Sequence, residues 1–373
     1  MTSTALDSAR NPATPAAPPA ASPAASPAAP PPAHPAPLAA FDALRRGDAA
    51  PDWLAGPVLR AWGLDPATTT LTLIAVSENA TFLVRAAGEP VSVLRVHRPG
   101  YVADPGQIVA ELRWVRALRR DTDVRVPDVV PTRDGDLVAA LDAAGTRWYV
   151  VAFGHVRGDV LEDVADPRPW YGRIGATTAH LHEHVARWSL PAGASRFSWR
   201  LTDALGAASR WGDWRGAALA PAERALLERA EAAARDDLAG LPTGGPGWGL
   251  VHADLRPSNV LVDGDDLTVI DFDDCGTTWL LWDFAAALSF IEHEPHAPEL
   301  ARSWVEGYRT VRDLPGEALR TAAALSTVRR LQMLGWTTTH RADALPAAVW
   351  DAQVPGTLAV AERYLARRTW LFD

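Results

Sequence analysis

Two nearby segments of the chain combine carboxylate, amide and imidazole side chains. The first contains His252, Asp254 and Asn259 and follows an apolar run, and the second is the apolar run 267–270 that ends at Asp271. Transfer of a phosphoryl group from a magnesium nucleotide needs a carboxylate that orients the attacking hydroxyl and accepts its proton. It also needs an amide and a second carboxylate that hold the metal on the phosphates. The spacing therefore indicates phosphoryl-transfer chemistry.

A β-hairpin must position these groups. Residues 260–262 and 267–270 have the pattern of two short strands, and the turn 263–266 reads Asp-Gly-Asp-Asp, which is a strong hairpin signal. Magnesium is a hard cation that prefers oxygen ligands, so Asn and Asp suit it where Cys or His would not. Alternation along the second strand predicts Asp271 and Asp273 on one face of an extended segment. The alternative is an Asp-rich turn between two buried strands.

Three motifs together resemble a known family. They are His252-x-Asp254-x4-Asn259, Ile270-Asp271-Phe272-Asp273 and Trp282-Asp283-Phe284-Ala285. In these motifs, and in element order over about residues 70–365, the chain is similar to the aminoglycoside phosphotransferase and choline kinase-like family, which shares the protein-kinase-like fold. The motifs are specific for the superfamily and do not identify a substrate.

The resemblance implies roles for five residues. It implies Asp254 as the catalytic base, Asn259 and Asp271 as ligands of Mg²⁺, and His252 and Asp283 as structural supports of the catalytic loop. It also implies ATP as the phosphoryl donor, with the choice between ATP and GTP left open. The implied acceptor is a small-molecule hydroxyl of the aminoglycoside, amino-alcohol or homoserine type.

The segment after Asp271 bears on the kind of acceptor. Asp283 follows Asp271 by only twelve positions, and no Ala-Pro-Glu sequence comes after it. A phosphorylation-controlled activation segment does not fit in that gap, so a small-molecule kinase is favoured over a regulated protein kinase. Two alternatives stay open: an atypical bacterial Ser/Thr protein kinase and a nucleotide-binding pseudokinase. The presence of Asp254 argues against the pseudokinase, because a pure binding protein needs no base.

The nucleotide side of the site is predicted around Arg95 and Glu111. Kinases of this fold place a cation from the third strand on the nucleotide phosphates and pair it with a Glu from the next helix. The chain has no lysine, and Arg95 stands at the corresponding strand position with Glu111 on the following helix. An Arg offers a planar fork where a Lys offers a point charge, so the geometry of phosphate contact differs. The alternatives are an ordinary surface ion pair and a phosphate contact through Arg98.

The loop between the first two strands is the second part of the nucleotide side. Ser77 and Asn79 belong to it, and Asn79 is one of three asparagines in the chain. The loop lacks the glycines of the protein-kinase loop, but its small residues allow backbone amides to approach phosphates. We therefore expect Ser77 and Asn79 to contact the nucleotide, although an ordinary hairpin turn explains the segment equally well.

Other clusters of polar and aromatic residues have weaker functional signals. His180, His182 and His184 alternate, and residues two apart on a helix do not share a face, so a structural role is favoured over a metal site. Asp273 and Asp274 extend the metal-binding segment, and Asp273 could reach a metal or a cationic substrate. Trp279, Trp282 and Trp336 are candidates to wall the substrate site.

Composition limits the remaining function classes. The 373 residues carry a net charge of −9, which argues against bulk binding to nucleic acid or to an anionic membrane. A single cysteine, Cys275, excludes an internal disulfide. No apolar run approaches membrane-spanning length and no secretory signal is visible, so a cytoplasmic location is expected. The oligomeric state is left open.

The order of elements predicts an α+β, bilobal protein-kinase-like fold. Residues 1–37 are an Ala/Pro-rich segment expected to be disordered, 38–153 form a β-rich nucleotide-binding lobe, and 154–373 form a helical lobe for catalysis and substrate binding. In the first lobe, strands are predicted at 69–76, 80–87, 91–97, 126–131, 136–142 and 146–153. In the second lobe, helices are predicted at 168–188, 198–214, 221–239, 279–293, 296–312, 316–340 and 345–369.

Overall fold

The computed structural model describes residues 36–102, 104–143, 145–340 and 344–373. The chain separates into two units, Met1–Pro35 and Ala36–Asp373, and only the second is described. The expected disordered segment 1–37 therefore lies almost wholly outside the described residues, and helix α1 (Ala36–Asp42) begins just before its predicted end. Within the described residues, no helix is both long and apolar enough to cross a membrane.

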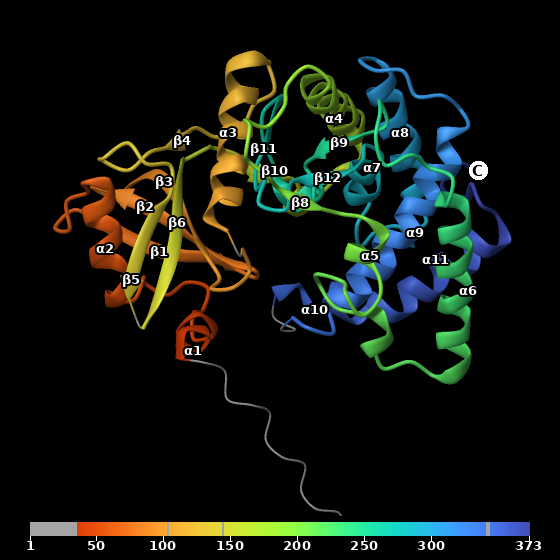
Figure 1. Ribbon diagram of the computed structural model, residues 1–373, viewed down its shortest axis with the longest axis horizontal. Coiled ribbons are helices and arrows are strands. Elements are labelled where there is room, and N and C mark those ends of the chain that lie inside the picture. Colours follow the sequence, from red (N-terminus) through yellow and green to blue (C-terminus); the bar gives the residue numbers. More distant parts are fainter. Residues whose placement is uncertain (1–35, 103, 144, 341–343) are drawn as a thin grey trace, which may run out of the picture. The chain divides into compact units, whose positions relative to one another are not determined.

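A six-stranded antiparallel sheet forms the first part of the described chain (Figure 1). Its strands are β1 (Thr69–Val76), β2 (Asn79–Ala86), β3 (Glu89–His97), β4 (Val129–Val130), β5 (Ala139–Ala143) and β6 (Thr146–Gly154). The order is β1-β2-β3-β6-β4, with β5 also paired to β6. Alternating apolar residues such as Phe82 and Val84 point into a compact core with Trp148, and Trp53 of α2 (Asp52–Trp62) stacks on Trp148 at 4.4 Å. Pro51 caps the start of α2, and Gly63, with a left-handed φ of 65°, caps its end.

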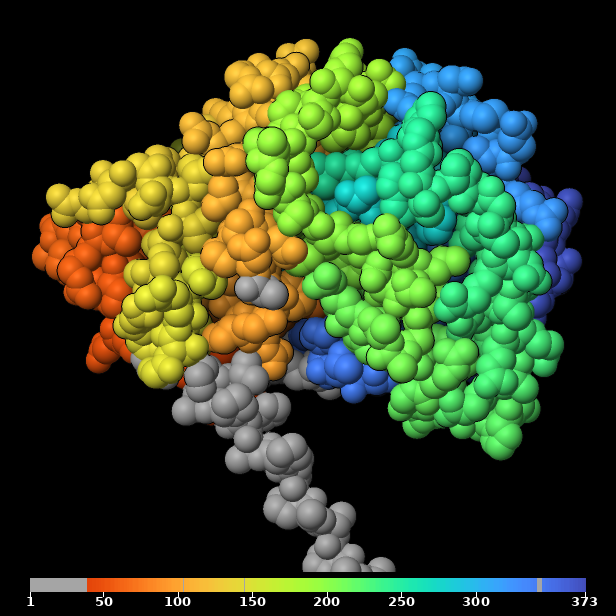
Figure 2. All heavy atoms as spheres, in the orientation of Figure 1, coloured from red at the N-terminus to blue at the C-terminus, as the bar shows by residue number. Residues whose placement is uncertain are grey.

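Helix α3 (Pro105–Asp121) crosses from the sheet to the helical part of the molecule. Its Asp104 cap accepts a hydrogen bond from Gly106 N, and Pro105 occupies the first turn, where its missing N–H costs nothing. Apolar residues of α3 such as Leu112 belong to the larger core of the second part, whereas buried Glu111 reaches β3. On the face drawn in Figure 2, the orange segment around α3 borders the yellow-green chain that leads into α4.

Helices dominate the second part (Figure 1). They are α4 (Tyr171–Val185), α5 (Leu201–Ala204), α6 (Pro221–Leu238), α7 (Trp282–Ala287), α8 (Ala297–Arg309), α9 (Ala318–Trp336), α10 (Ala347–Asp351) and α11 (Gln353–Ala366). Short 3₁₀ turns lie at Leu161–Asp163, Arg168–Trp170, Trp214–Gly216, Pro257–Asn259 and Trp370–Phe372. Helices α4 and α8 pack so closely that a Cβ on Gly307 would lie 1.8 Å from the carbonyl oxygen of Gly172. Glycine is therefore required at this crossing.

Two small sheets hold the segments that contain His252, Asp254, Asn259 and Asp271. One has the order β11-β10-β7 and the other β8-β12-β9. Their strands are β7 (Asp159–Val160), β8 (Phe197–Ser198), β9 (Trp248–Val251), β10 (Val260–Asp263), β11 (Asp266–Val269) and β12 (Gly276–Trp279). The chain runs from β9 through a loop into the β10–β11 hairpin and returns to β12, which pairs with β9. This return brings residues 252–259 and 270–275 together.

The predicted α+β, protein-kinase-like fold is confirmed, and several element boundaries were wrong. The helix expected at 198–214 is only the four-residue α5, because Gly206 and Gly212 take positive φ values and end regular structure. The helix expected at 279–293 is the shorter α7, and the strand expected at 126–131 is the two-residue β4. The expected shared face of Asp271 and Asp273 was also wrong, because β11 ends at Val269 and Asp271 has a φ of 62°.

Candidate active site

The loop after β9 is held by hydrogen bonds to the side chain of Asp283 in α7. Asp283 accepts hydrogen bonds from the backbone N–H groups of Ala253 at 2.7 Å and His252 at 3.2 Å. Ala253 has a left-handed φ of 69°, an uncommon conformation for a residue with a Cβ. The His252 ring contacts the Ile270 carbonyl oxygen at 3.0 Å through Nε2. The fully buried Asp283 thus fixes the start of the loop, and His252 fastens the loop to the returning chain.

Helix α4 supports the same carboxylate from the other side. His182 Nε2 lies 3.1 Å from Asp283 Oδ2, and its Nδ1 lies 2.9 Å from the Tyr308 hydroxyl. His184 instead contacts Trp114 and Asp121. Among the described residues, no group of three or more His, Cys, Asp or Glu side chains could hold a metal ion. These contacts support the structural interpretation of the His-rich helix.

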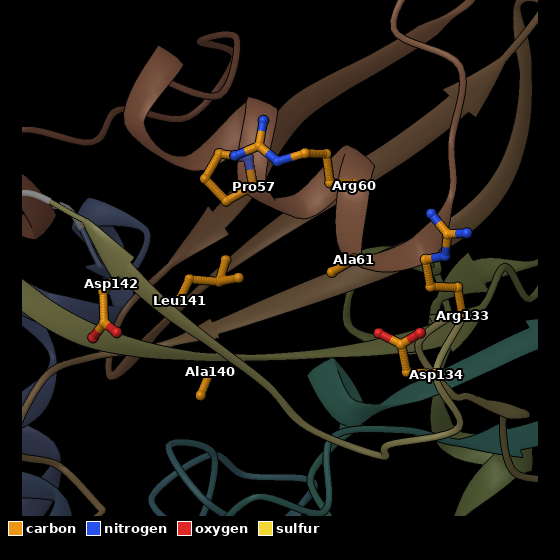
Figure 3. A pocket seen from close by; sticks show the side chains of 8 residues that line it. All are labelled: Pro57, Arg60, Ala61, Arg133, Asp134, Ala140, Leu141 and Asp142. Atoms are coloured by element: carbon orange, nitrogen blue, oxygen red, sulfur yellow. The ribbon is translucent and has the colours of Figure 1, made fainter.

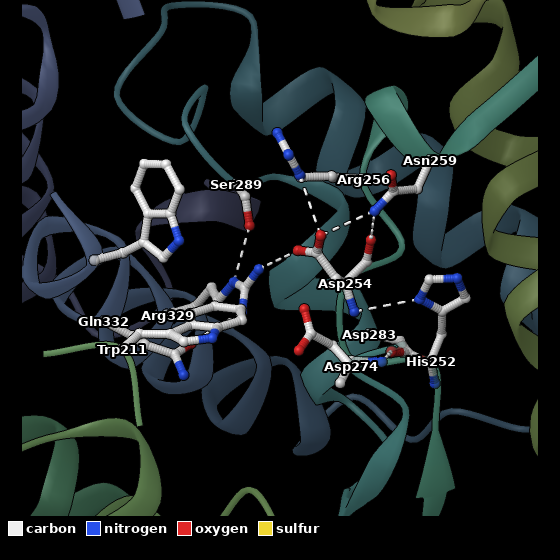
Figure 4. Close-up of polar contacts among 12 residues, drawn as sticks. Trp211, His252, Asp254, Arg256, Asn259, Asp274, Asp283, Ser289, Arg329 and Gln332 are labelled. Atoms are coloured by element: carbon white, nitrogen blue, oxygen red, sulfur yellow. Dashed lines mark hydrogen bonds and ion pairs between the residues drawn. The ribbon is translucent and has the colours of Figure 1, made fainter. Parts of the chain in front are cut away.

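Asp254 lies at the centre of a cluster of donors (Figure 4). Its Oδ2 accepts from Asn259 Nδ2 at 2.9 Å and from Arg256 Nε at 3.3 Å, and its Oδ1 accepts from Arg329 Nη2. The Asp254 side chain keeps 14% of its surface exposed, whereas Arg329 is 1% exposed. The carboxylate is thus oriented by three side chains and still reaches the surface of the site, as a group that meets a substrate hydroxyl must.

Asn259 lies beside Asp254, and Asp271 follows Ile270, whose N–H donates to the Asn259 carbonyl oxygen at 3.0 Å. The Asn259 amide nitrogen also donates to the Asp254 carbonyl oxygen at 2.8 Å, so both of its recorded side-chain bonds use nitrogen. Asn259 Oδ1 accepts no hydrogen bond from the described residues. The Asp271 side chain is 45% exposed and follows a strained left-handed backbone. A carbonyl and a carboxylate oxygen are hard ligands, so this donor set fits a divalent cation such as Mg²⁺.

Arg95 of β3 connects the two parts of the molecule. It donates through Nη2 to both carboxylate oxygens of Glu111, at 2.6 and 2.7 Å, and through Nη1 to Asp271 at 3.1 Å. Burial alone would lower the pKa of the Arg95 guanidinium, but the charges of Glu111, Asp273 and Asp271 raise it well above its ordinary value. The Arg95–Glu111 pair is buried and is therefore no surface ion pair. Arg98 pairs with Asp42 at 3.5 Å.

The loop between β1 and β2 is attached to the second part at two points. Asn79 Nδ2 donates to Asp273 Oδ2, and Glu78 Oε1 accepts from Trp336 Nε1 of α9 at 2.5 Å and lies 3.0 Å from His340 Nε2. Burial raises the pKa of the Asp273 carboxyl well above its ordinary range, and the charges of Asp271 and Asp274 add to this effect. Ser77 donates its backbone N–H to the Asn79 carbonyl oxygen at 2.9 Å. The loop therefore lies directly over the predicted metal-binding segment.

Three residues near Asp254 were given no role from the sequence: Arg329, Tyr101 and Trp211. Asp274 was predicted only as an extension of the metal-binding segment. Arg329 also donates to Ser289 Oγ at 3.1 Å and to Gln332 Oε1 at 2.9 Å, and it lies 4.9 Å from the centre of the Trp211 ring. The signal that could have found Arg329 is its place in the apolar helix pattern 322–336, because a charged residue there must be paired when it is buried. No comparable local signal marks Tyr101 or Trp211.

A hollow elsewhere on the surface is separate from these groups (Figure 3). It has a volume of about 590 Å³ and lies between α2 and the chain around β5. Its lining residues are Pro57, Arg60, Ala61, Arg133, Asp134, Ala140, Leu141 and Asp142. None of them belongs to the cluster around Asp254, so this hollow does not contribute to the predicted chemistry.

Comparisons with known proteins agree with this geometry. The model of the phosphotransferase enzyme family matches residues 70–325. An uncharacterised protein of Deinococcus radiodurans is 30% identical over 295 residues, which cover 77% of this chain and 81% of that protein. A solved structure described as a microcompartment-associated aminopropanol kinase is 40% identical with a TM-score of 0.77, and the match covers 85% of this chain and 98% of that one.

A more distant solved structure shows the same fold. It is the amicoumacin kinase hAmiN in complex with AMP-PNP, Ca²⁺ and Ami, which is 18% identical with a TM-score of 0.65. The match covers 83% of this chain and 92% of that chain. The family match spans most of the described residues, including every residue predicted for catalysis, metal binding, nucleotide contact or support of the loop. The chain therefore belongs to the phosphotransferase enzyme family and is a small-molecule kinase.

Proposed function

We propose that this protein transfers the γ-phosphoryl group of ATP to the hydroxyl of a small amino alcohol. The observation that carries the proposal is the convergence of Asp254, Asn259 and Asp271 on one hairpin, beside the buried Arg95–Glu111 pair. The 40% identity to an aminopropanol kinase supports an acceptor of the amino-alcohol class over a larger aminoglycoside. Homoserine, hydroxylysine and choline-like alcohols belong to the same range of sizes and remain to be compared directly.

Asp254 is the proposed base. The acceptor hydroxyl loses its proton to Asp254 as its oxygen forms the new bond to the γ-phosphorus, and the bond from that phosphorus to the oxygen bridging to the β-phosphorus breaks, releasing ADP. Arg329, Arg256 and Asn259 orient the carboxylate through the hydrogen bonds described above. Because the carboxylate is held in place before the acceptor arrives, no reorganisation is needed during transfer.

Asn259 and Asp271 are the proposed ligands of Mg²⁺, which when bound neutralises charge on the transferring phosphates. Arg95 is the proposed phosphate contact, with Glu111 fixing the plane of its guanidinium. Ser77 and Asn79 are proposed to approach the phosphates through the loop between β1 and β2. Asn79 Oδ1 and Arg95 Nε are buried without a hydrogen-bond partner among the described residues, which is consistent with a site for a polar ligand. We also propose that residues 38–153 form the nucleotide-binding lobe and 154–373 the catalytic lobe.

The two alternative functions receive less support. The residues between Asp271 and Asp283 contain β12, which pairs with β8 and β9, so they form a sheet strand and leave no long segment for docking a protein substrate. A pseudokinase that only binds nucleotide has no need of a carboxylate oriented by three side chains. Both observations favour transfer to a small molecule.

ADP release from Mg-ATP, measured across hydroxylated amines, amino acids, sugars and aminoglycosides, tests the proposal. We expect release that depends on an amino-alcohol acceptor and that disappears in Asp254→Asn. The matched control is Asp236→Asn, which removes an exposed carboxylate on α6 far from the site. Release that is equal in the Asp254→Asn variant, or that occurs only with aminoglycosides, would contradict the assignment of the base or of the acceptor class, respectively.

A further inference from the structure

Four carboxyl groups gather around the proposed acceptor position, and they differ in their partners. Asp254 has Arg329 and Arg256, Asp271 has Arg95, and Glu78 has His340. The fourth, Asp274, has no cationic nitrogen within 4.0 Å among the described residues. Adjacent Asp273 likewise has no such cation among the described residues, but its Oδ2 accepts a hydrogen bond from Asn79 Nδ2. Asp274 is thus the acidic group beside Asp254 that is left without a cation.

Asp274 is nevertheless buried and carefully oriented. The residue is 6% exposed, and its Oδ1 accepts a hydrogen bond from the Tyr101 hydroxyl at 2.8 Å. That hydroxyl in turn accepts from Trp211 Nε1 at 3.2 Å, and Trp199 Nε1 holds the Asp274 carbonyl oxygen at 2.8 Å. Asp274 Oδ2 accepts no hydrogen bond from the part of the chain that the structure describes. Figure 4 shows the Asp274 carboxyl beside Asp254, on the side that faces Arg329 and Trp211.

The charge state of Asp274 agrees with this geometry. Burial raises the pKa of the Asp274 carboxyl to about 8, and the negative charges of Asp254 and Glu78 add to the effect, while the Tyr101 hydrogen bond opposes it. A buried carboxyl without a cation is unstable as an anion, and a positive group within hydrogen-bond reach restores the ionised form. The site is therefore complementary to a cation that arrives with the substrate.

An ammonium group suits this position better than a metal ion. Asp274 is surrounded by a phenol hydroxyl and two indole N–H groups, which are hydrogen-bond donors or apolar ring surfaces and poor metal ligands. A primary ammonium offers three donors and a short apolar stem, so it can satisfy one carboxylate oxygen while its carbon atoms lie against the aromatic side chains.

We propose that Asp274, oriented by Tyr101 and Trp211, binds the protonated amine of the acceptor and directs the neighbouring hydroxyl toward Asp254. This inference rests on the proposed function and specifies how the acceptor class is selected. A neutral alcohol of the same size gains nothing at Asp274 and leaves a buried polar group unpaired, so it is discriminated against. The two acidic residues thereby have different roles: Asp274 binds the ammonium group and Asp254 accepts the proton of the hydroxyl.

The test compares 1-amino-2-propanol with 1,2-propanediol in wild type, Asp274→Asn and the control Asp236→Asn. In wild type and the control we expect kcat/KM to favour the amine by roughly 30-fold or more, the usual cost of unpairing a buried charge. In Asp274→Asn we expect this preference to collapse, mainly through a higher KM for the amine. The KM for ATP should change by less than about threefold, because the proposed nucleotide contacts do not include Asp274.

Propylamine provides a second measurement that does not depend on the stability of a variant. It has the amine and lacks the hydroxyl, so in wild type it should inhibit competitively against 1-amino-2-propanol, whereas 1-propanol at the same concentration should not. Equal inhibition by propylamine and propanol would overturn the subsite. Retention of the amine preference in an Asp274→Asn protein with a melting temperature raised by Mg-ATP would overturn it as well.

The outcomes separate the two proposals. If wild type phosphorylates amino alcohols and Asp274→Asn keeps the same preference, the subsite is wrong and the proposed function stands. If wild type phosphorylates neutral diols as efficiently as amines, the enzyme is a kinase without an amine subsite. If wild type phosphorylates neither compound nor any other amino alcohol, both proposals are overturned.

Discussion

The catalytic loop and the nucleotide side of the site are organised in different ways. In the loop, Asp283, His252 and Asp254 each have hydrogen-bond partners within the protein. On the nucleotide side, Asn79 Oδ1, Arg95 Nε and both ring nitrogens of His97 are buried without partners among the described residues. Burial, with the charges of Arg95 and Arg196, lowers the pKa of His97 well below its ordinary value, so this ring is neutral. The acidic and imidazole groups of the loop are thus oriented by protein contacts, whereas the proposed nucleotide side has several buried polar atoms without partners among the described residues.

The two regions also differ in how far apart their contacts lie in the sequence. Asn259 and Asp254 are 5 residues apart, and His252 and Ile270 are 18 apart. Asn79 and Asp273 are 194 residues apart, and Glu78 and Trp336 are 258 apart. The loop contacts, including that of Arg329 with Asp254 across 75 residues, lie within the second part of the molecule, whereas the contacts of Asn79 and Glu78 join the first part to the second. We therefore expect changes in the loop to affect turnover and changes on the nucleotide side to affect nucleotide binding.

The largest expected effect is that of Asp254→Asn. We expect kcat to fall by about 10³-fold or more, because the proton of the hydroxyl loses its acceptor. The Kd for Mg-ATP should change by less than about threefold, because the amide keeps the shape of the side chain. Single-turnover rates and nucleotide titrations measure the two quantities separately. A variant with near-normal turnover would show that the loop is organised around some task other than proton transfer.

Asp271→Ala should have the next largest effect, and on a different quantity. Loss of this carboxylate should weaken Mg-ATP binding by about 100-fold, while binding of ATP in the presence of EDTA changes little. The comparison of the two titrations isolates the metal-dependent part. An equal loss with and without magnesium would assign Asp271 to the support of Arg95, with which it is paired at 3.1 Å, and remove it from the metal site.

Arg95→Lys tests whether the proposed nucleotide side affects nucleotide binding more than turnover. A lysine keeps the charge but has one nitrogen, so it cannot contact Glu111 through one nitrogen and Asp271 through another as Arg95 does. We therefore expect the KM for ATP to rise about tenfold with a smaller change in kcat. Steady-state kinetics at saturating acceptor measure this split. The control is Arg113→Lys, an exposed arginine on the same helix as Glu111. A fall in kcat without a change in the KM for ATP would indicate that Arg95 acts in the transfer step, as the loop residues do, and contributes little to nucleotide binding.

Glu78→Gln should have the smallest effect on turnover and a pH-dependent effect on stability. Burial by itself would raise the pKa of Glu78, but hydrogen bonds from His340, Trp336 and Ser77 and the charge of His340 lower it to about 2. A carboxyl whose pKa is lower in the folded state stabilises the protein above its ordinary pKa, and this contribution is lost as the pH falls from 4.5 toward 2.

Urea unfolding of wild type and Glu78→Gln between pH 6 and pH 3.5 measures this contribution. The difference in unfolding free energy should be largest at pH 6 and should shrink as the pH falls below about 4.5. A difference that is independent of pH would mean that the Glu78 contacts to α9 contribute nothing through charge.

The parts of the site that the sequence predicted well are the ones built from local structure. The β10–β11 hairpin follows from two apolar runs around an Asp-Gly turn, and the positions of Asp254 and Asn259 follow from the residue order in the loop. The prediction failed where local pattern and tertiary packing disagree. Alternation implied an extended chain at Asp271, but the hydrogen bond of Ile270 N to the Asn259 carbonyl oxygen and the contact with Arg95 hold it in a left-handed conformation.

The sequence by itself determined the family, the fold class and the chemical type of the catalytic groups, because these depend on short motifs and on periodicities that a chain displays without folding. The tertiary structure alone decided which charges meet. Arg329 reaches Asp254 across 75 residues, Asn79 reaches Asp273, and Asp274 remains without a cation while Asp254 and Asp271 each have one. Such pairings depend on how separate elements pack, because the interaction energy between two buried charges depends on the distance between them.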